Sequence, residues 1–436
     1  MVPAPHLLPP DDALRRQLHD EVHARPPASL QLPALVTFVA VLNADISRDQ
    51  EAAHLRALPG QAGLTAQSLE GNFLRLYLEG YSLKWERHSE FTRYSIVQPL
   101  AASDSVRQPA EVLAALAGSA QWLRAIPGAT VAAVQLAMVH GDLQQGSALM
   151  ELAQQWLAGS DIVGSQLGHG HSAAYTEFKI GADGFERMLV VAPLGTSQAR
   201  AGRISQRLLE LETYRLMALR GLPVVKDLGP ELAQAETALA DITARLEGNT
   251  ASDQQLLDQL VALAARVERY VAIHSYRFSA TQAYNNLVVQ RIAELREKVM
   301  PGTQTIGEFM QRRLSPAMAT VAATAQRLAT LSERVSRTSA LLRTRVDIAT
   351  ELQNQQLLEK LTRGQELQLR LQTTVEGLSI AAISYYVVSL LHYAVKALIA
   401  AGVPINLEVA VGASVPIVLW SVWRITRKVQ VALDKK

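Results

Sequence analysis

The stretch LSIAAISYYVVSLLHYAVKALIAA, residues Leu378–Ala401, carries one formal charge, Lys396, near its far end. Its residues, about 24 in number, would form a helix about 36 Å long, which is enough to cross a hydrocarbon core of about 30 Å. After a break at 402–406, a second apolar run extends from about Leu407 to Trp423 and ends in two tryptophans, residues suited to a membrane interface. The two runs predict a transmembrane hairpin, with a buried core hairpin as the alternative.

Basic residues lie on one side of this hairpin. Arg424, Arg427 and Lys428 follow the second run, whereas the loop 402–406 holds no Lys or Arg. The positive-inside bias therefore puts both termini in the cytoplasm. Residues 1–12 lack a basic segment followed by an apolar core, so we expect no signal peptide. These features predict a multi-pass protein of the bacterial inner membrane, with the lipid bilayer as a partner.

Composition limits the remaining possibilities. A chain of 436 residues can form two or three domains. The net charge of +2 and the 5% aromatic content argue against a nucleic-acid partner. The absence of cysteine excludes disulfides, thiolate metal sites and cysteine nucleophiles.

Residues 1–197 combine predicted strands with short helices, which indicates a cytoplasmic α/β domain. We expect strands at Ala34–Leu42, Phe73–Leu78, Tyr81–Val97, Thr130–Val139, Tyr175–Ile180 and Glu186–Val191. We expect helices at Ala13–His23, Arg48–Ala57, Glu111–Leu123 and Ser147–Trp156.

Two groups of residues in this domain have spacings that could bind a metal. His19 and His23 lie four apart on one helix face, as in H-E-x-x-H zinc sites, although no third ligand is evident. Glu86, His88 and Glu90 would line one face of a strand at intervals of about 7 Å. The structural alternatives are a capped surface helix and a solvated sheet face with cross-strand ion pairs.

A third weak metal candidate is the segment 168–171, Gly-His-Gly-His, whose glycines favour a mobile loop. The chain contains no Gly-rich phosphate loop, nucleophile elbow or complete metal triad. We therefore expect no enzymatic activity and no cofactor.

Residues 198–374 are rich in Leu, Ala, Gln, Arg and Glu and predict a helical stalk. We expect helices at Ser197–Leu219, from Gly229 to Gly248, from Ser252 to Val299, and from Thr305 onward. A helix over Ser315–Ala401 would be about 130 Å long.

Its apolar positions predict a coiled-coil seam that pairs with the preceding helix, with another subunit, or with both. The second case would make the protein a homo-oligomer. The seam comprises Leu314, Met318, Val321, Ala325, Leu328, Leu331, Val335, Leu342, Val346, Ala349 and Leu352.

Four segments together resemble a bacterial family described as predicted membrane-anchored proteins, the domain of unknown function 3422. They are DEVHARPP (20–27), LKWERHSEF (83–91), TEFKIGADGFERMLV (176–190) and VEGLSIAAISYYVVSLL (375–391). The resemblance implies architecture and location, and it brings no catalytic residues.

The overall plan is also similar, in topology only, to the two-span magnesium channels of the CorA type. Their Gly-Met-Asn motif is absent, because the loop reads Gly-Val-Pro-Ile-Asn at 402–406. A polar stripe of Tyr385, Ser389, His392 and Lys396 runs down the first span. It could line a pore around an oligomer axis, or pack on the second span at the small residues 412–414 with Lys396 reaching the outer headgroups.

The sequence thus predicts an α+β multi-domain membrane protein. Its parts are a cytoplasmic α/β domain at 1–197, a helical coiled-coil stalk at 198–374, and a transmembrane hairpin with a basic tail at 375–436. We expect a membrane-anchored scaffold that faces the cytoplasm, and the alternative is an ion channel.

Overall fold

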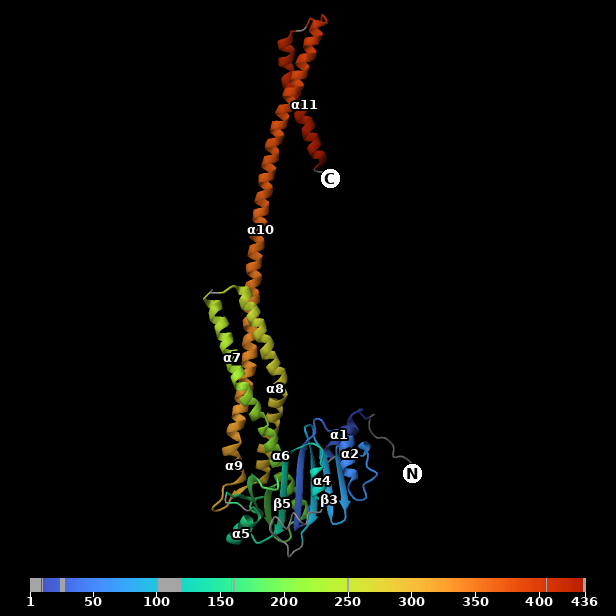
Figure 1. The fold of residues 1–436 in the computed structure, drawn as a ribbon, viewed down its shortest axis with the longest axis vertical. Coiled ribbons are helices and arrows are strands. Elements are labelled where there is room, and N and C mark those ends of the chain that lie inside the picture. Colours follow the sequence, from blue (N-terminus) through green and yellow to red (C-terminus); the bar gives the residue numbers. More distant parts are fainter. Residues whose placement is uncertain are drawn as a thin grey trace. The chain divides into compact units, whose positions relative to one another are not determined.

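A computed structural model describes residues 9, 11–23, 28–100, 119–157, 159, 161–248, 251–404 and 406–433. The fold is mixed α+β, as predicted (Figure 1). The chain forms two compact units: unit 1 is 1–250 with 258–337, and unit 2 is 251–257 with 338–436. The division into three domains at 197 and 374 stays a prediction.

Unit 1 contains a nine-stranded sheet in the order β2-β3-β4-β1-β5-β8-β7-β6-β9. β5 and β8 are parallel, and the other neighbouring pairs are antiparallel. The strands are β1 (Ala34–Leu42), β2 (Phe73–Leu78), β3 (Tyr81–Arg87), β4 (Phe91–Pro99), β5 (Ala129–His140), β6 (Val163–Leu167), β7 (Ser172–Ile180), β8 (Glu186–Ala192) and β9 (Lys298–Val299).

One face of the sheet is covered by short helices and holds two apolar clusters. The helices are α2 (Arg48–Arg56), η1 (Ala66–Leu69), α4 (Ala120–Arg124) and α5 (Gly146–Leu157). Near one end Leu83 and Trp85 are fully buried, in a cluster with Leu55 of α2. Near the other end Trp156 of α5 donates a hydrogen bond to the carbonyl oxygen of Met188 at 2.9 Å.

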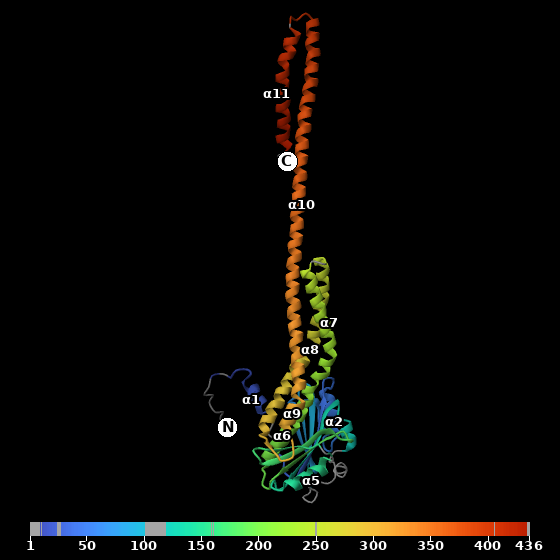
Figure 2. The same ribbon diagram turned by 90° about the vertical axis from the view of Figure 1, so that its left-hand side faces the viewer.

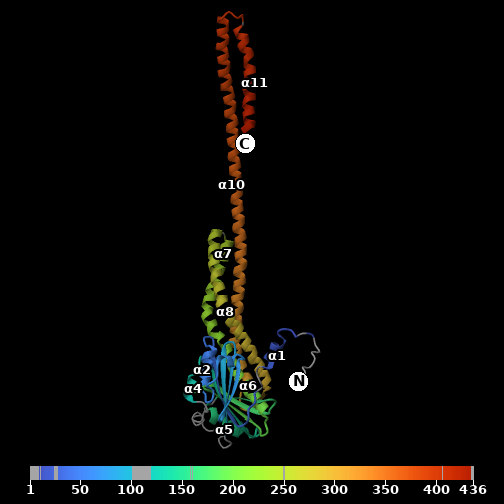
Figure 3. The ribbon, with the colours of Figure 1, turned by 90° about the vertical axis from the view of Figure 1, so that its right-hand side faces the viewer.

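The opposite face carries α6 (Gln198–Leu219), which contacts β5. Figures 2 and 3 show α2 and α6 on opposite sides of the sheet. The approach of the segment 28–33 to α6 requires Gly202, because a Cβ there would overlap the carbonyl oxygen of Ala28.

Three longer helices follow, α7 (Gly221–Glu247), α8 (Asp253–Leu295) and α10 (Ser315–Ala400), with the short α9 (Ile306–Arg313) before α10. Arg327 of α10 bonds to Glu236 of α7 at 2.7 Å, and the Tyr270 hydroxyl of α8 donates to Glu231 of α7 at 2.7 Å. The three helices therefore pack together within one chain.

This packing occupies the first part of the predicted seam. Leu314, Leu328 and Val335 are buried in unit 1, and Leu342 is buried in unit 2. The seam fades beyond this point, since Leu352 is 54% exposed. Most of the seam is therefore buried within the chain, and an ion pair joins this part of α10 to α7, whereas the predicted partner was the helix 252–299.

Several helix ends differ from the prediction. α7 begins at Gly221 rather than Gly229, and Pro230 lies inside it. Pro223 is tolerated in the first turn of α7 because an N–H there would have no intrahelical partner. Pro230 removes one backbone hydrogen bond from the helix, and burial of Leu228 and Leu232 offsets this loss. α8 ends at Leu295 rather than Val299 because Lys298–Val299 forms the edge strand β9.

The remaining predicted elements are found with small shifts. The short helix α1 spans Arg15–His23, and β7 and β8 form the expected antiparallel hairpin. Most of the predicted helix Glu111–Leu123 lies outside the described residues. At its end, Ala120–Arg124 form the helix α4. β6 was not predicted, because Gly164, Ser165 and Gln166 hide its apolar pattern.

In unit 2, α11 (Leu407–Leu433) returns alongside the end of α10 (Figures 1–3). Within the described residues, these two helices are long and apolar enough to cross a membrane. Their apolar side chains lie largely at the surface, with Leu390 70% and Ile417 64% exposed.

Candidate functional site

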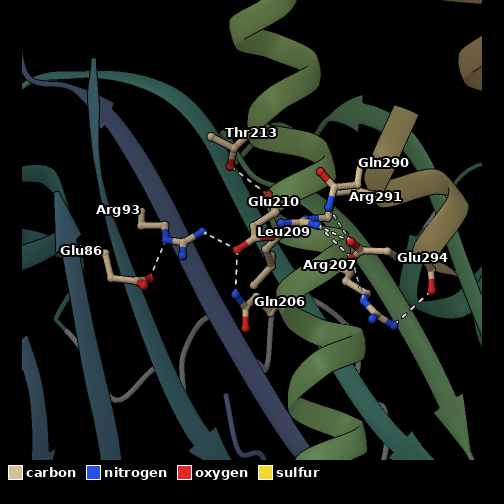
Figure 4. Close-up of polar contacts among 10 residues, drawn as sticks. All are labelled: Glu86, Arg93, Gln206, Arg207, Leu209, Glu210, Thr213, Gln290, Arg291 and Glu294. Atoms are coloured by element: carbon tan, nitrogen blue, oxygen red, sulfur yellow. Dashed lines mark hydrogen bonds and ion pairs between the residues drawn. The ribbon is translucent and has the colours of Figure 1, made fainter. Parts of the chain in front are cut away.

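A chain of buried charges lies between the sheet and the helices on its α6 face (Figure 4). Glu86 of β3 and Arg93 of β4 are partners across neighbouring strands, and Arg93 Nε donates to Glu86 Oε2 at 2.5 Å. Arg93 Nη1 also reaches Glu210 Oε1 of α6 at 3.3 Å. The side chains of Glu86, Arg93 and Glu210 are each at most 5% exposed.

The chain of charges continues into α8. Glu210 accepts hydrogen bonds from Arg291 Nε at 2.6 Å and from Gln206 Nε2 at 2.8 Å. Arg291 Nη1 in turn donates to both oxygens of Glu294 at 2.8 Å, and Arg207 pairs with Glu294 at 3.2 Å. We call Glu86, Arg93, Glu210, Arg291, Glu294 and Arg207 the charge network.

Two carboxylates of the charge network, Glu86 and Glu210, are held in their ionised form. Burial acts to raise the pKa of Glu86, but the charge and hydrogen bond of Arg93, together with Lys84, outweigh it and hold the pKa at about 2. Burial likewise acts on Glu210, and Arg93, Gln206 and Arg291 outweigh it, so its pKa is also lowered. These groups are therefore suited to holding elements together and not to proton transfer near neutral pH.

A second buried carboxyl pair lies further along the same face. Glu186 of β8 and Glu212 of α6 share Arg215, which bonds to Glu212 at 2.8 Å and lies 3.7 Å from Glu186. Thr176 Oγ1 donates to Glu186 at 3.2 Å. Burial, and then the neighbouring Glu212, raise the pKa of Glu186 well above its usual range. The surroundings of Glu186 thus disfavour its ionised form.

A cleft of about 640 Å³ lies beside the charge network. Its walls are the segment 28–34, the α6 side of β2, β3 and β4, and the first turns of α6. Lys84 and Gln206 connect the cleft to the charge network, because both line the cleft, Lys84 bonds to Glu86, and Gln206 bonds to Glu210.

The lining of the cleft is basic and rich in hydroxyl groups. Among the described residues that line it, Arg75 and Lys84 are the charged side chains, and none is acidic. The hydroxyl-bearing side chains are Ser29, Tyr77, Tyr81, Ser82, Ser95 and Ser205.

The structure does not bring Glu86, His88 and Glu90 together, and the single strand predicted over Tyr81–Val97 is wrong. β3 ends at Arg87 and β4 begins at Phe91, so the chain reverses at 88–90, where no Gly or Pro marks the turn. Glu86 joins the charge network and is buried, not solvated. Glu90 pairs with Arg277 of α8, and the His88 ring stacks on Phe91 at 4.6 Å.

The other histidine candidates lie apart from these residues. His19 and His23 are one turn apart on α1, and the side chain of His23 lies outside the described ones. The segment 168–171 is a tight turn between β6 and β7, and the His169 N–H donates to the carbonyl oxygen of Arg296 at 3.1 Å. No group of three or more His, Asp or Glu in the described part of the chain could hold a metal ion.

The polar stripe of α10 is only partly covered. Ser389 and His392 are half-buried, whereas Tyr385 is 71% exposed and Lys396 is exposed. One predicted alternative packs the stripe against the small residues 412–414 of α11. Of these, 412 and 413 are exposed and 414 is half-buried.

Most residues of the charge network and the cleft were not singled out from the sequence. Arg93 in FTRYSIVQP and Glu210 in LLELETYRL each interrupt an apolar run, and such isolated charges in core elements are the signal that could have found them. Arg93 and Glu210 lie 117 residues apart in the chain, so their contact could be found only in the structure.

The comparisons with known proteins identify one family. The model of the family described as protein of unknown function (DUF3422) matches residues 10–433, so the chain belongs to this family. Neither a curated protein nor a solved structure matches the chain, and the resemblance to CorA channels gains no support.

Proposed function

We propose that this member of the DUF3422 family is a membrane-anchored interaction protein without enzymatic activity. In this proposal α10 and α11 cross a bacterial inner membrane and hold unit 1 on the cytoplasmic side. The carrying observation is α10 itself, an uninterrupted helix whose first turns are buried in unit 1 and whose last turns are apolar and exposed. A folded unit and its anchor thus share one helix.

The state of the carboxylates supports a non-enzymatic role. A general acid or base needs a pKa near the working pH and access to a substrate. Glu86 and Glu210 are ionised and fully occupied by arginines, and Glu186 is buried with Arg215 and Thr176. We infer that these groups fix the helices on the sheet.

A second part of α10 supports self-association. Leu357, Leu361, Leu371, Val375 and Leu378 fall on one 4-3 heptad register, completed by Gly364 and Gln368. The five apolar side chains are 57–67% exposed. We call this register the outer seam. The outer seam forms the a and d positions of this register, and no charged residue of 353–378 occupies one of them. The charged residues of this segment are Glu359, Lys360, Arg363, Glu366, Arg370 and Glu376.

Membrane anchoring would favour pairing along the outer seam. Copies inserted in one membrane present this helix in parallel and at the same height, so identical seams would meet in register. We therefore propose a homo-oligomer built on the outer seam, in place of the longer seam that α7 and α8 already occupy.

The alternative function, an ion conduit, has one specific observation in its favour. The 4-3 spacing of the outer seam continues through Ala382 into Tyr385, Ser389, His392 and Lys396. Helices joined along the outer seam would therefore direct the polar stripe to the same axis. Cation flux into proteoliposomes that is lost in Ser389→Leu would favour the conduit over the scaffold.

Membrane extraction tests the anchor. We expect the full chain to stay in the membrane pellet after carbonate washing. Val388→Arg together with Ile417→Arg should weaken retention, because each charge costs about 2.5–3.5 kcal/mol at the centre of a span. Arginines at exposed positions outside both spans, at Thr344 and Thr350, serve as the matched control. Release of the unaltered protein would contradict the proposal.

Disulfide cross-linking tests the oligomer, and the absence of native cysteine makes the background clean. Leu371→Cys should give a cross-linked dimer in native membranes under mild oxidation. Thr373→Cys, at the same depth on the opposite helix face, should not. Equal cross-linking of the two variants would refute pairing along the outer seam.

A further inference from the structure

The cleft of unit 1 has a floor that is unusual for a sheet. Arg75 of β2 pairs in register with Lys84 of β3, which pairs with Ser95 of β4. Residues directly opposite each other on neighbouring antiparallel strands have their Cβ atoms about 4.5–5.5 Å apart, and like charges there repel. The sheet therefore places two cations side by side at the bottom of a cleft.

The acidic groups nearby do not balance these two cations. Lys84 Nζ contacts Glu86 Oε2 at 2.9 Å, but the same oxygen also accepts from Arg93 at 2.5 Å. Arg75 lies over the Phe73 ring at 5.8 Å, and no acidic residue lies among the described ones that line the cleft. An excess of positive charge thus faces the open space.

The environment of Lys84 agrees with this excess. Burial, and then the charge of Arg93, lower the pKa of Lys84, although Glu86 and Glu210 act to raise it. A bound anion would act in the opposite direction, because a nearby negative charge favours the protonated amine.

From this geometry we propose that the cleft binds an organic phosphate, with the phosphate group between Arg75 and Lys84. Ser82 lies two residues before Lys84 on β3, and Ser95 lies opposite Lys84 on β4, so their hydroxyl groups can donate to the remaining oxygens. The proposal goes beyond the anchoring role and does not depend on it.

The rest of the cleft fits the organic part of such a ligand. Its volume of about 640 Å³ lies within the range of small-molecule sites. Leu30, Val36, Val97 and Leu209 supply apolar lining. Tyr77, 78% exposed, lies at the opening, where its ring can cover the ligand.

The experiment measures binding by the full chain in detergent micelles at constant ionic strength. The probes are inorganic phosphate, phenyl phosphate and succinate. Equilibrium dialysis measures the affinity of each probe, and thermal unfolding measures the stabilisation that each probe gives. We expect phenyl phosphate to bind more tightly than inorganic phosphate, and succinate to bind at least tenfold more weakly than phenyl phosphate. Arg75→Gln should lower the phosphate affinity about tenfold or more, since it removes a charged hydrogen-bond donor.

Matched variants separate this site from general charge effects. Arg203→Gln removes an exposed cation of α6 that does not line the cleft, and it should leave binding unchanged. Arg75→Lys should recover part of the affinity because it restores the charge. Lys84→Gln is less informative alone, since it also removes a partner of Glu86.

The outcomes distinguish the source of the phosphate. Binding of phenyl phosphate in solution identifies a soluble ester, whereas binding only to nanodiscs that contain phosphatidic acid identifies a lipid headgroup. Both support the site if Arg75→Gln weakens them. No binding of any phosphate probe, equal binding in Arg75→Gln, or succinate as tight as phenyl phosphate would overturn the proposal.

Discussion

Replacing Arg93 by Met tests how much the charge network contributes to the fold of unit 1. Arg93 is 4% exposed and contacts Glu86 at 2.5 Å and Glu210 at 3.3 Å. Removing one partner of a buried ion pair typically costs about 3–5 kcal/mol. Neither carboxylate would lose all partners, because Lys84 stays with Glu86 and Arg291 with Glu210. We therefore expect the lower end, about 3 kcal/mol.

A matched surface pair provides the control. Arg327 and Glu236 lie 2.7 Å apart with side chains 48% and 32% exposed. Exposed ion pairs contribute about 0–1 kcal/mol, so Arg327→Met should cost at most about 1 kcal/mol. Adding Glu86→Gln to Arg93→Met should recover part of the loss, since it removes a buried charge that is short of a partner.

Urea unfolding followed by tryptophan fluorescence measures these differences. Trp420→Phe and Trp423→Phe are introduced into every protein, so that the three tryptophans of unit 1, Trp85, Trp122 and Trp156, remain as reporters. Equal costs for Arg93→Met and Arg327→Met would refute the reasoning, because burial is the property that separates the two pairs.

Acid should reduce the difference between Arg93→Met and the unaltered protein. The pKa of Glu86 is about 2 in the folded chain and 4.5 ordinarily, so the stabilisation is complete above about pH 4.5 and is lost as the pH falls toward 2. Glu186→Gln should stabilise unit 1 near pH 7 and have less effect near pH 4, since folding raises the pKa of Glu186 and this costs stability only where the unfolded chain is ionised, above about pH 4.5. His54 is buried against Trp122, which lowers its pKa to about 4, so stability should fall between pH 6.5 and 4 and fall less in His54→Phe. Gly202→Ala should displace the segment 28–33 and weaken phosphate binding in the cleft, measured by dialysis, whereas Gly229→Ala, with open space at its Cβ, should not.

The sequence predicted best those helices and strands whose positions depend on local sequence patterns alone. The continuous apolar runs of β1 and β5 and the capping box at Thr305 gave strand and helix positions within one or two residues. The alternation in β3 also placed Lys84 and Glu86 correctly on the face opposite Leu83. The prediction that this face is solvated failed because its cover, α6, begins more than a hundred residues later.

The candidate site was less predictable for the same reason. The row Arg75–Lys84–Ser95 depends on the register of three strands. The turn at 88–90 sets part of this register, and it contains Ser89 but no Gly, Pro, Asn or Asp. Arg93 and Glu210 were visible as isolated charges in apolar surroundings, but their partnership arises only when α6 packs on the sheet.

The location of the loop between α10 and α11 tests the central claim most directly. Single cysteines are placed at Val403 in this loop and at Glu79 in the exposed β2–β3 turn, and intact cells are treated with a membrane-impermeant maleimide. The account predicts labelling of Val403→Cys before lysis and of Glu79→Cys only after lysis. Labelling of Glu79→Cys in intact cells, or protection of Val403→Cys until lysis, would contradict a membrane hairpin with unit 1 in the cytoplasm.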